Sequence, residues 1–159
     1  MPKIKIKPIV TYRLRGRKET ATRTLLATRD LIDVSDEPLD RDGTNEGFAP
    51  TEFVLGGLAA CTNVISHKIA AAHGIEIIDL DIGLVAKFNR MGVNLEEDVE
   101  LPFPEIRMTV EVTTTASIDQ VRIIESELHK YCAVAKLIRK SGTNIIEEWR
   151  VKPPADRPA

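Results

Sequence analysis

The stretch 53-FVLGGLAACTNVISHKIAAAHGI-75 decides the fold, because it predicts a long helix that is apolar over most of its length. The helix should begin near Pro50, carry Glu52 in its first turn and end at about His73, where Gly74 can stop it. Its apolar positions point in nearly all directions over the first half, which is typical of a helix enclosed on every side. In a small domain a sheet can cover one side, and the same helix of a second copy is the most economical cover for the rest. The pattern therefore predicts a homodimer.

The residues before this helix predict a hairpin followed by a polar loop. Residues 3–15 alternate basic and apolar side chains, and residues 20–34 return with partial alternation, so we expect two strands joined by a turn at residues 15–18. Residues 35–50 are rich in Pro, Gly, Asp and Asn and predict a long loop. Long loops in small domains are often functional.

The residues after the helix predict strand, strand, helix, strand. We expect strands at residues 75–88, 105–115 and 143–151. Residues 89–104 connect the first two of these strands. Ser117 and Gln120 form a capping-box pattern that opens a helix, and Ile118, Val121, Ile124, Leu128 and Tyr131 make its apolar stripe. Helical character continues over residues 132–142. The fold class is therefore α+β, with antiparallel sheets around a central helix, as one domain over residues 1–151 and a disordered tail over 152–159.

Composition excludes several classes of function. The net charge of −2 gives no electrostatic case for nucleic acid. Asn63, His67 and Lys68 would be costly in lipid, so we expect no membrane span. The N-terminus has no signal-peptide pattern, and a cytoplasmic location is the expectation. The histidines and cysteines form no metal pattern, so neither a metal nor a cofactor is expected.

Two cysteines, Cys61 and Cys132, are the candidates for chemistry. Their spacing forms no local redox or zinc motif. Small residues surround Cys61, and Gly56 and Gly57 weaken the helix, which is reasonable if another helix or a substrate must approach closely. Each cysteine could simply be a buried apolar residue. Cys132 could pack beside Tyr131 or face Cys61 across two helices, and the spacing decides neither.

The loop 35-SDEP-38, the segment 40-DRDGTNEGFAPTE-52 and the helix that follows resemble the OsmC/Ohr family of osmotically inducible and organic hydroperoxide resistance proteins. The resemblance covers roughly residues 30–150, and Cys132 matches the family's second cysteine. It implies an OsmC-like fold and an intertwined homodimer. It also implies a thiol peroxidase in which Cys61 attacks a hydroperoxide and becomes a sulfenic acid, Cys132 resolves it as a disulfide, and an external dithiol reduces the disulfide.

The resemblance also implies a cation beside Cys61, because the thiol lies too far along its helix for the helix N-terminus to stabilise a thiolate. Glu52 matches the family's glutamate, which holds an activating arginine. Arg41 in the loop is our first choice for that arginine, and Arg17 in the expected turn is the alternative.

Three functions remain open from the sequence. The first is a thiol-dependent peroxidase for organic hydroperoxides or hydrogen peroxide. The second is a non-catalytic redox sensor or a protein that binds an apolar small ligand. In the third, both cysteines merely pack. A usable Arg–Glu pair would favour the first.

Overall fold

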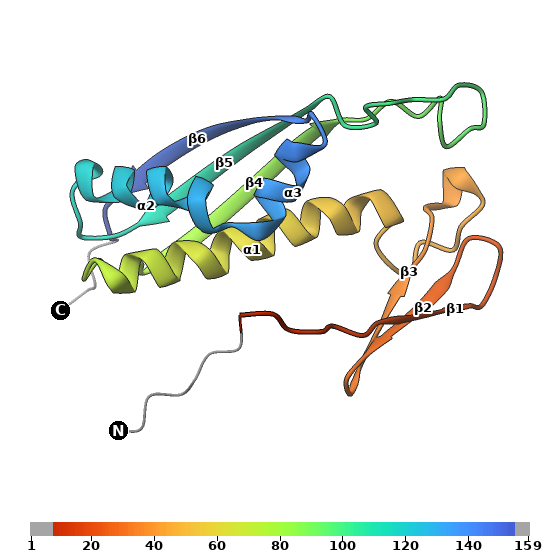
Figure 1. Ribbon diagram of the computed structural model, residues 1–159, viewed down its shortest axis with the longest axis horizontal. Coiled ribbons are helices and arrows are strands. Elements are labelled where there is room, and N and C mark those ends of the chain that lie inside the picture. The colour runs from red at the N-terminus through yellow and green to blue at the C-terminus, as the bar shows by residue number, and fades with distance from the viewer. Residues whose placement is uncertain (1–7, 155–159) are drawn as a thin grey trace. The chain divides into compact units, whose positions relative to one another are not determined.

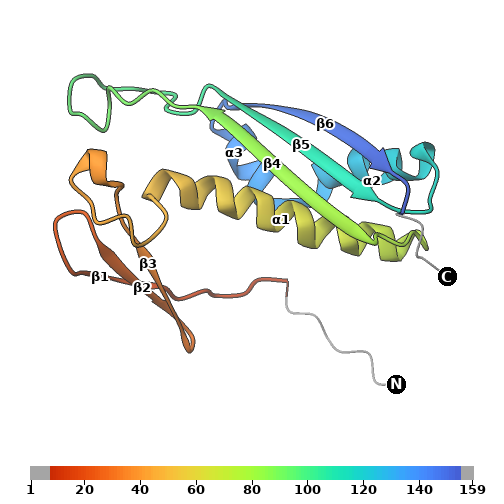
Figure 2. The same ribbon diagram turned by 180° about the vertical axis from the view of Figure 1, so that it is seen from behind.

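The computed structural model describes residues 8–154. The chain divides into two compact units, with the boundary in the sequence between Val54 and Leu55. Figure 1 and Figure 2 show the two units from opposite sides. The first unit contains a small sheet and a loop. The second contains most of the central helix, two further helices and a second sheet. The single domain expected over residues 1–151 stays a prediction. The tail expected over residues 152–159 begins one residue too early, because Lys152 still belongs to a strand, and residues 155–159 lie outside the described part of the chain.

The first unit is an antiparallel sheet of β1 (Arg15–Lys18), β2 (Thr24–Thr28) and β3 (Leu31–Ser35), in that order. The prediction of a strand over residues 3–15 was wrong for residues 8–14, and its last residue, Arg15, is the first residue of β1. Residues 8–14 form no strand, and residues 1–7 lie outside the described part of the chain. The turn expected at 15–18 is β1 itself, and residues 20–34 contain two strands rather than one.

The expected loop follows β3 and contains a short 3-10 helix, η1 (Leu39–Arg41). The buried carboxylate of Asp36 holds this loop together. It accepts hydrogen bonds from the backbone N–H groups of Glu37 and Thr44 and from the Thr44 hydroxyl, at 2.9, 2.9 and 2.6 Å. These bonds, with Thr44 Oγ1 contributing most, lower the pKa of Asp36 to about 2. The loop therefore has a charged internal anchor.

The second unit is built on a sheet of β4 (Asp79–Lys87), β5 (Glu105–Thr113) and β6 (Asn144–Lys152). β4 and β5 are antiparallel as expected, whereas β5 and β6 are parallel, so the prediction of antiparallel sheets was wrong for β6. A parallel pair needs a long crossover, and α2 (Ile118–Tyr131) and α3 (Ala133–Lys140) provide it. Figures 1 and 2 show both helices on the same face of the sheet as α1. The predicted elements of this unit are all present.

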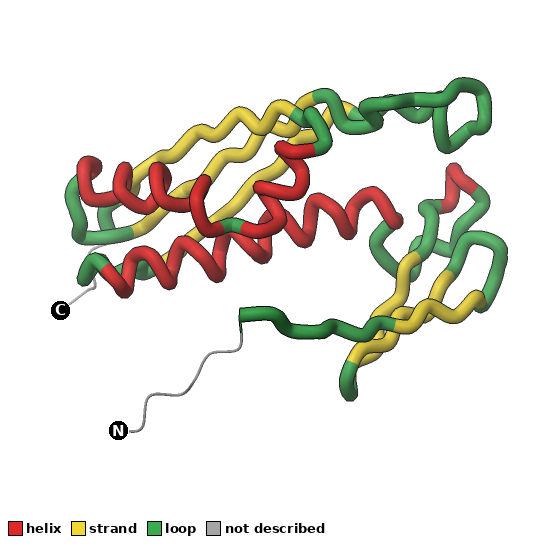
Figure 3. Tube along the Cα trace, in the orientation of Figure 1, coloured by secondary structure: helices red, strands yellow, loops and turns green. Residues whose placement is uncertain are grey.

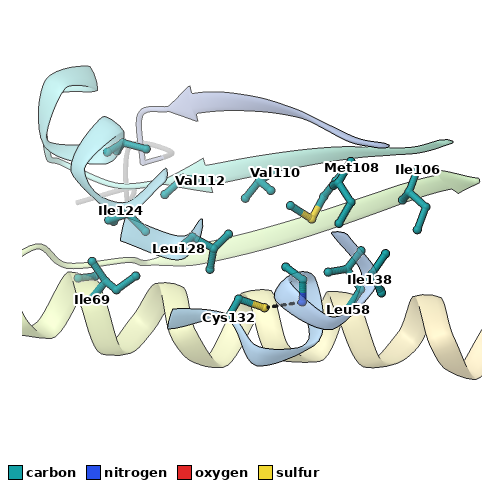
Figure 4. Packing of buried hydrophobic residues seen from close by; sticks show 14 of the residues in the cluster. Leu58, Ile69, Ile106, Met108, Val110, Val112, Ile124, Leu128, Cys132 and Ile138 are labelled. Carbon is teal, nitrogen blue, oxygen red and sulfur yellow. Dashed lines mark hydrogen bonds between the residues drawn. The ribbon is translucent and has the colours of Figure 1, made fainter. Parts of the chain in front are cut away.

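The core lies between this face of the sheet and the helices. Every second residue of β5 points inward and is fully or almost fully buried, and Figure 4 shows them above the helices: Ile106, Met108, Val110 and Val112. α2 contributes Val121, Ile124 and Leu128, as its predicted stripe requires, and the Ser117–Gln120 capping box is present. The two ends of that stripe, Ile118 and Tyr131, are exposed.

The central helix α1 (Pro50–Ala72) has the predicted length, and Gly74 follows it with a positive φ of 66°. It is covered on one face, where Leu58, Thr62, Ser66, Ile69 and Ala70 are buried. Val64 on another face is 49% exposed. By length and apolar composition α1 could cross a membrane, a test that core helices of soluble proteins also pass. The cover expected from a second copy stays a prediction.

Candidate active site

Cys132 sits at a break between two helices. α2 ends at Tyr131 and α3 begins at Ala133, and Cys132 between them has an extended backbone with φ −72° and ψ 105°. Figure 3 shows this interruption of the helical chain. The backbone N–H of Cys132 still donates to the Leu128 carbonyl at 2.9 Å, while its Sγ accepts the N–H of Ala135 at 3.4 Å (Figure 4). Cys132 thus ends one helix and caps the next.

This break places the two thiols in contact. Cys61 Sγ and Cys132 Sγ are 3.1 Å apart, although 71 residues separate them in the sequence. Both cysteines are free thiols. The sequence left open whether Cys132 packs on its own helix or faces Cys61, and the structure shows that it faces Cys61. At this separation the two sulfurs need to move about 1 Å to form a disulfide bond.

The two thiols differ in their exposure. Cys132 is completely buried, whereas Cys61 is partly exposed. Burial raises the pKa of Cys132 to about 11, the Ala135 N–H opposes that shift, and the neighbouring Cys61 adds to it. Cys132 is therefore protonated at neutral pH, and its S–H donates to Cys61 Sγ. Cys61 Sγ is therefore the acceptor in this pair.

An apolar groove of about 460 Å³ lies between α1 and α2 and begins near the residues that neighbour the two cysteines. Its lining comes from α1 and α2: Ile65, Lys68, Ile69, Ala72, Glu127 and Tyr131. Ile65 is one helical turn beyond Cys61, and Tyr131 directly precedes Cys132. The groove can accommodate an apolar group between α1 and α2, and Lys68 and Glu127 are its charged members.

Glu52 and Arg41, the other predicted site residues, belong to the first unit. The Glu52 carboxylate accepts the N–H of Ala49 at 2.8 Å and so caps the first turn of α1. The Arg41 guanidinium pairs with Glu37 at 3.1 Å. Within residues 8–154 these two side chains form no ion pair with each other. Their role beside the thiol stays a prediction.

Sequence reasoning missed one feature of the site and one buried polar group on the helix that carries Cys61. Ala135 acts through its backbone N–H, which no side-chain pattern indicates. Ser66, on the buried face of α1 that carries Thr62, has a hydroxyl that is buried and has no hydrogen-bond partner within the described chain. The available signal for Ser66 was its spacing of four residues from Thr62 and from Ala70, which puts the three on one face of the helix.

The chain is similar in sequence and structure to known proteins. The family model described as OsmC-like protein matches residues 43–148. The structure is similar to an OsmC-like protein from Mycoplasma pneumoniae, with 18% identity, a TM-score of 0.76 and coverage of 89% of this chain and 97% of that one. OhrB, the organic hydroperoxide resistance protein of Bacillus subtilis, is 20% identical with a TM-score of 0.57, and the match covers 90% of this chain and 98% of that one.

A third similar structure is an organic hydroperoxide resistance protein OsmC from Legionella pneumophila, with 16% identity and a TM-score of 0.64 over 92% of this chain and 99% of that one. No curated protein sequence matches the chain. At these identities the structural likeness establishes the α+β fold, and the family model covers most of the chain. The protein therefore belongs to the OsmC-like family.

Proposed function

We propose that this protein is a thiol-dependent peroxidase that reduces organic hydroperoxides, with Cys61 as the nucleophile and Cys132 as the resolving thiol. The observation that carries the proposal is the 3.1 Å contact between a partly exposed sulfur and a fully buried one. An oxidant arriving from solvent meets Cys61 first. Cys132 is then within reach of whatever forms on Cys61.

In the first step the Cys61 thiolate attacks the terminal oxygen of the hydroperoxide. An S–O bond forms, the O–O bond breaks, and the departing alkoxide takes a proton to become an alcohol. Cys61 loses two electrons and becomes a sulfenic acid. The S–H of Cys132 supports this step because it donates to Cys61 Sγ and so stabilises the thiolate that reacts.

In the second step Cys132 Sγ attacks Cys61 Sγ. An S–S bond forms, the S–O bond breaks, and the hydroxide leaves with the Cys132 proton as water. An external dithiol then reduces the disulfide by thiol–disulfide exchange and is itself oxidised to a disulfide. Because the thiols must be regenerated, a reducing compartment such as the cytoplasm suits this cycle.

The groove supports an organic rather than a purely inorganic peroxide. Ile65, one helical turn beyond Cys61, begins a groove whose apolar surface continues along α1 through Ile69 and Ala72, and an alkyl or aryl group can cover that surface. Hydrogen peroxide has no group that would use this surface. Proteins of similar fold carry the description organic hydroperoxide resistance protein.

The test is consumption of cumene hydroperoxide by the purified protein in the presence of a dithiol. Cys61→Ser should abolish turnover. Cys132→Ser should still react once and leave a sulfenic acid on Cys61 that dimedone traps. The proposal fails if the wild-type protein, fully reduced and mixed with equimolar peroxide, keeps both thiols.

We also propose that Glu52 and Arg41 assist Cys61, as the family resemblance implies. Arg41→Ala should slow the first step, and Arg17→Ala is the matched comparison because Arg17, in β1, is the alternative cation. If Arg17→Ala slows the reaction and Arg41→Ala does not, the assignment moves to Arg17. Equal rates for both variants and the wild type would remove the arginine from the mechanism.

A homodimer completes the proposal. Val64 is half exposed on α1, and side chains added at Gly56 or Gly57 would meet open space within this chain. Apolar surface of this kind on a central helix favours contact with a second copy. Light scattering of the purified protein at about micromolar concentration should give twice the chain mass, and the mass of one chain would contradict the dimer.

A further inference from the structure

A buried carboxylate, Glu147, lies on the inward face of β6 and is not part of the cysteine chemistry described above. Its side chain is only 5% exposed. Its Oε1 accepts hydrogen bonds from Arg139 Nη2 at 2.5 Å and lies 3.3 Å from His129 Nε2. Its Oε2 accepts the indole N–H of Trp149 at 3.3 Å. Both oxygens of the carboxylate are therefore occupied.

The partners of Glu147 lie on either side of Cys132. His129 is in the last turn of α2, just before the helix break, and Arg139 is in the last turn of α3, beyond it. Both reach the same oxygen of one side chain on β6. The ends of two helices that a non-helical residue joins are thus tied to one point of the sheet.

The bonds from Glu147 to both helices matter because the hydrogen bonding of the helix is interrupted at Cys132. In an unbroken helix the position of one residue fixes that of the next, whereas the extended Cys132 allows α2 and α3 to shift relative to each other. Burying a carboxylate is costly unless charged or polar partners compensate for the lost water. The partners that compensate for burying Glu147 come from α2, α3 and β6: His129, Arg139 and Trp149.

We propose that Glu147 is a positioning residue that holds the helix break on β6 and so keeps Cys132 Sγ within reach of Cys61 Sγ. The inference rests on the proposed function for its role in turnover. The step it serves is the closure of the disulfide, in which Cys132 Sγ bonds to Cys61 Sγ and water departs. Closure is intramolecular, and a displacement of about 1 Å in such a reaction can slow it by orders of magnitude.

The experiment separates the oxidation of Cys61 from disulfide closure. Glu147→Gln keeps the size of the side chain and an acceptor oxygen but removes the charge that Arg139 pairs with. Glu148→Gln is the matched control, because its neighbour Glu148 is 60% exposed on the other face of β6 and pairs with Arg150. Stopped-flow measurement with cumene hydroperoxide gives the rate of Cys61 oxidation, which should equal the wild-type rate in Glu148→Gln and should fall by a smaller factor than the rate of closure in Glu147→Gln, because Cys132 donates only one hydrogen bond in the first step but is itself the nucleophile in the second.

Closure should then be slower by at least about tenfold in Glu147→Gln, and dimedone should trap Cys61 sulfenic acid that the wild type does not accumulate. Glu148→Gln should close at the wild-type rate. A Glu147→Gln protein that unfolds more easily but closes at the wild-type rate would overturn the proposal, because Glu147 would then serve only stability. If Glu147→Gln does not fold, Arg139→Gln replaces it in the experiment, because it removes the bond from α3 to Glu147. Slow closure would again support the proposal, and closure at the wild-type rate would again overturn it.

A second measurement keeps this inference independent of peroxidase activity. In buffers of oxidised and reduced glutathione the Cys61–Cys132 disulfide forms by exchange, two glutathione thiols being released for each disulfide. Glu147→Gln should require a more oxidising ratio than Glu148→Gln to reach half oxidation, because the two thiols meet less often. Equal ratios would overturn the positioning role even in a protein that reduces no peroxide.

Discussion

The buried thiol of Cys132 should make the reduced protein less stable at alkaline pH. Folding raises the pKa of this thiol from 9.0 to about 11, so the folded protein holds the proton more tightly than the unfolded chain. The stabilisation is fully present below about pH 9, and it is lost progressively as the pH rises to about 11. Each pKa unit corresponds to about 1.4 kcal/mol, so about 2 to 3 kcal/mol of the free energy of unfolding should disappear over this range.

The assay compares urea unfolding of the wild type with Cys132→Ala from about pH 7 to about pH 11, in the presence of a phosphine reductant. Lysines and tyrosines also titrate in this range, but they do so in both proteins and cancel in the difference. The alanine variant carries a constant loss from removing the buried sulfur. The wild-type advantage should hold below about pH 9 and shrink by about 2 to 3 kcal/mol above it.

The reasoning is refuted if the free energies of unfolding of the two proteins differ by the same amount from about pH 7 to about pH 11. Cys132 would then have the same pKa in the folded and unfolded chains. A wild-type advantage that grows with pH would refute it more strongly. That result would mean that the Ala135 N–H and the start of α3 outweigh burial and favour the thiolate. Cys132 could then no longer act as the proton donor to Cys61.

Three further predictions concern stability. Ser66→Ala should raise the free energy of unfolding by about 1 kcal/mol in urea unfolding, because it removes a buried hydroxyl without a partner; a loss of stability would indicate an unseen hydrogen bond. Leu58→Ala should lower it by about 2 to 5 kcal/mol in the same assay, because Leu58 is completely buried, and an unchanged value would place Leu58 outside the core. Asp36→Asn should make the stability of the fold less dependent on pH in acid. Folding lowers the pKa of Asp36 from 3.8 to about 2, so the wild type should be more stable than the variant above about pH 4 and should lose this advantage as the pH drops towards 2. Thermal unfolding of both proteins at several pH values measures the difference.

The second unit could be predicted from the sequence because its signals are local. The alternation in β4 and β5 and the Ser117–Gln120 box each depend on a few neighbouring residues. The start of β4 was placed too early, at residue 75. The N–H of Ile75 bonds to the Ala70 carbonyl at 2.9 Å, so the residues after Gly74 first close the end of α1.

The first unit was harder because its turn lacks the expected residues. We placed the turn at the glycine in 15–18, but Gly16 lies within β1. The chain reverses at residues 19–23, where Thr20 Oγ1 accepts the N–H groups of Thr22 and Arg23 at 3.2 and 2.9 Å. A threonine can hold a turn in this way, although glycine and proline are the stronger signals. The regular alternation of basic and apolar residues is confined to residues 3–7, and the sequence of residues 8–14, PIVTYRL, no longer follows it.

The contact between the two cysteines could not be predicted from the sequence. The family resemblance identified Cys61 and Cys132, but no local rule predicted their contact, because no glycine or proline marks the end of α2. The break depends on Cys132 itself, which accepts the Ala135 N–H with its side chain and so replaces a serine or threonine as the cap of α3. A cap must leave the helical backbone conformation, and this departure turns the sulfur towards α1. The residue that resolves the proposed sulfenic acid therefore also creates the bend that brings it to Cys61.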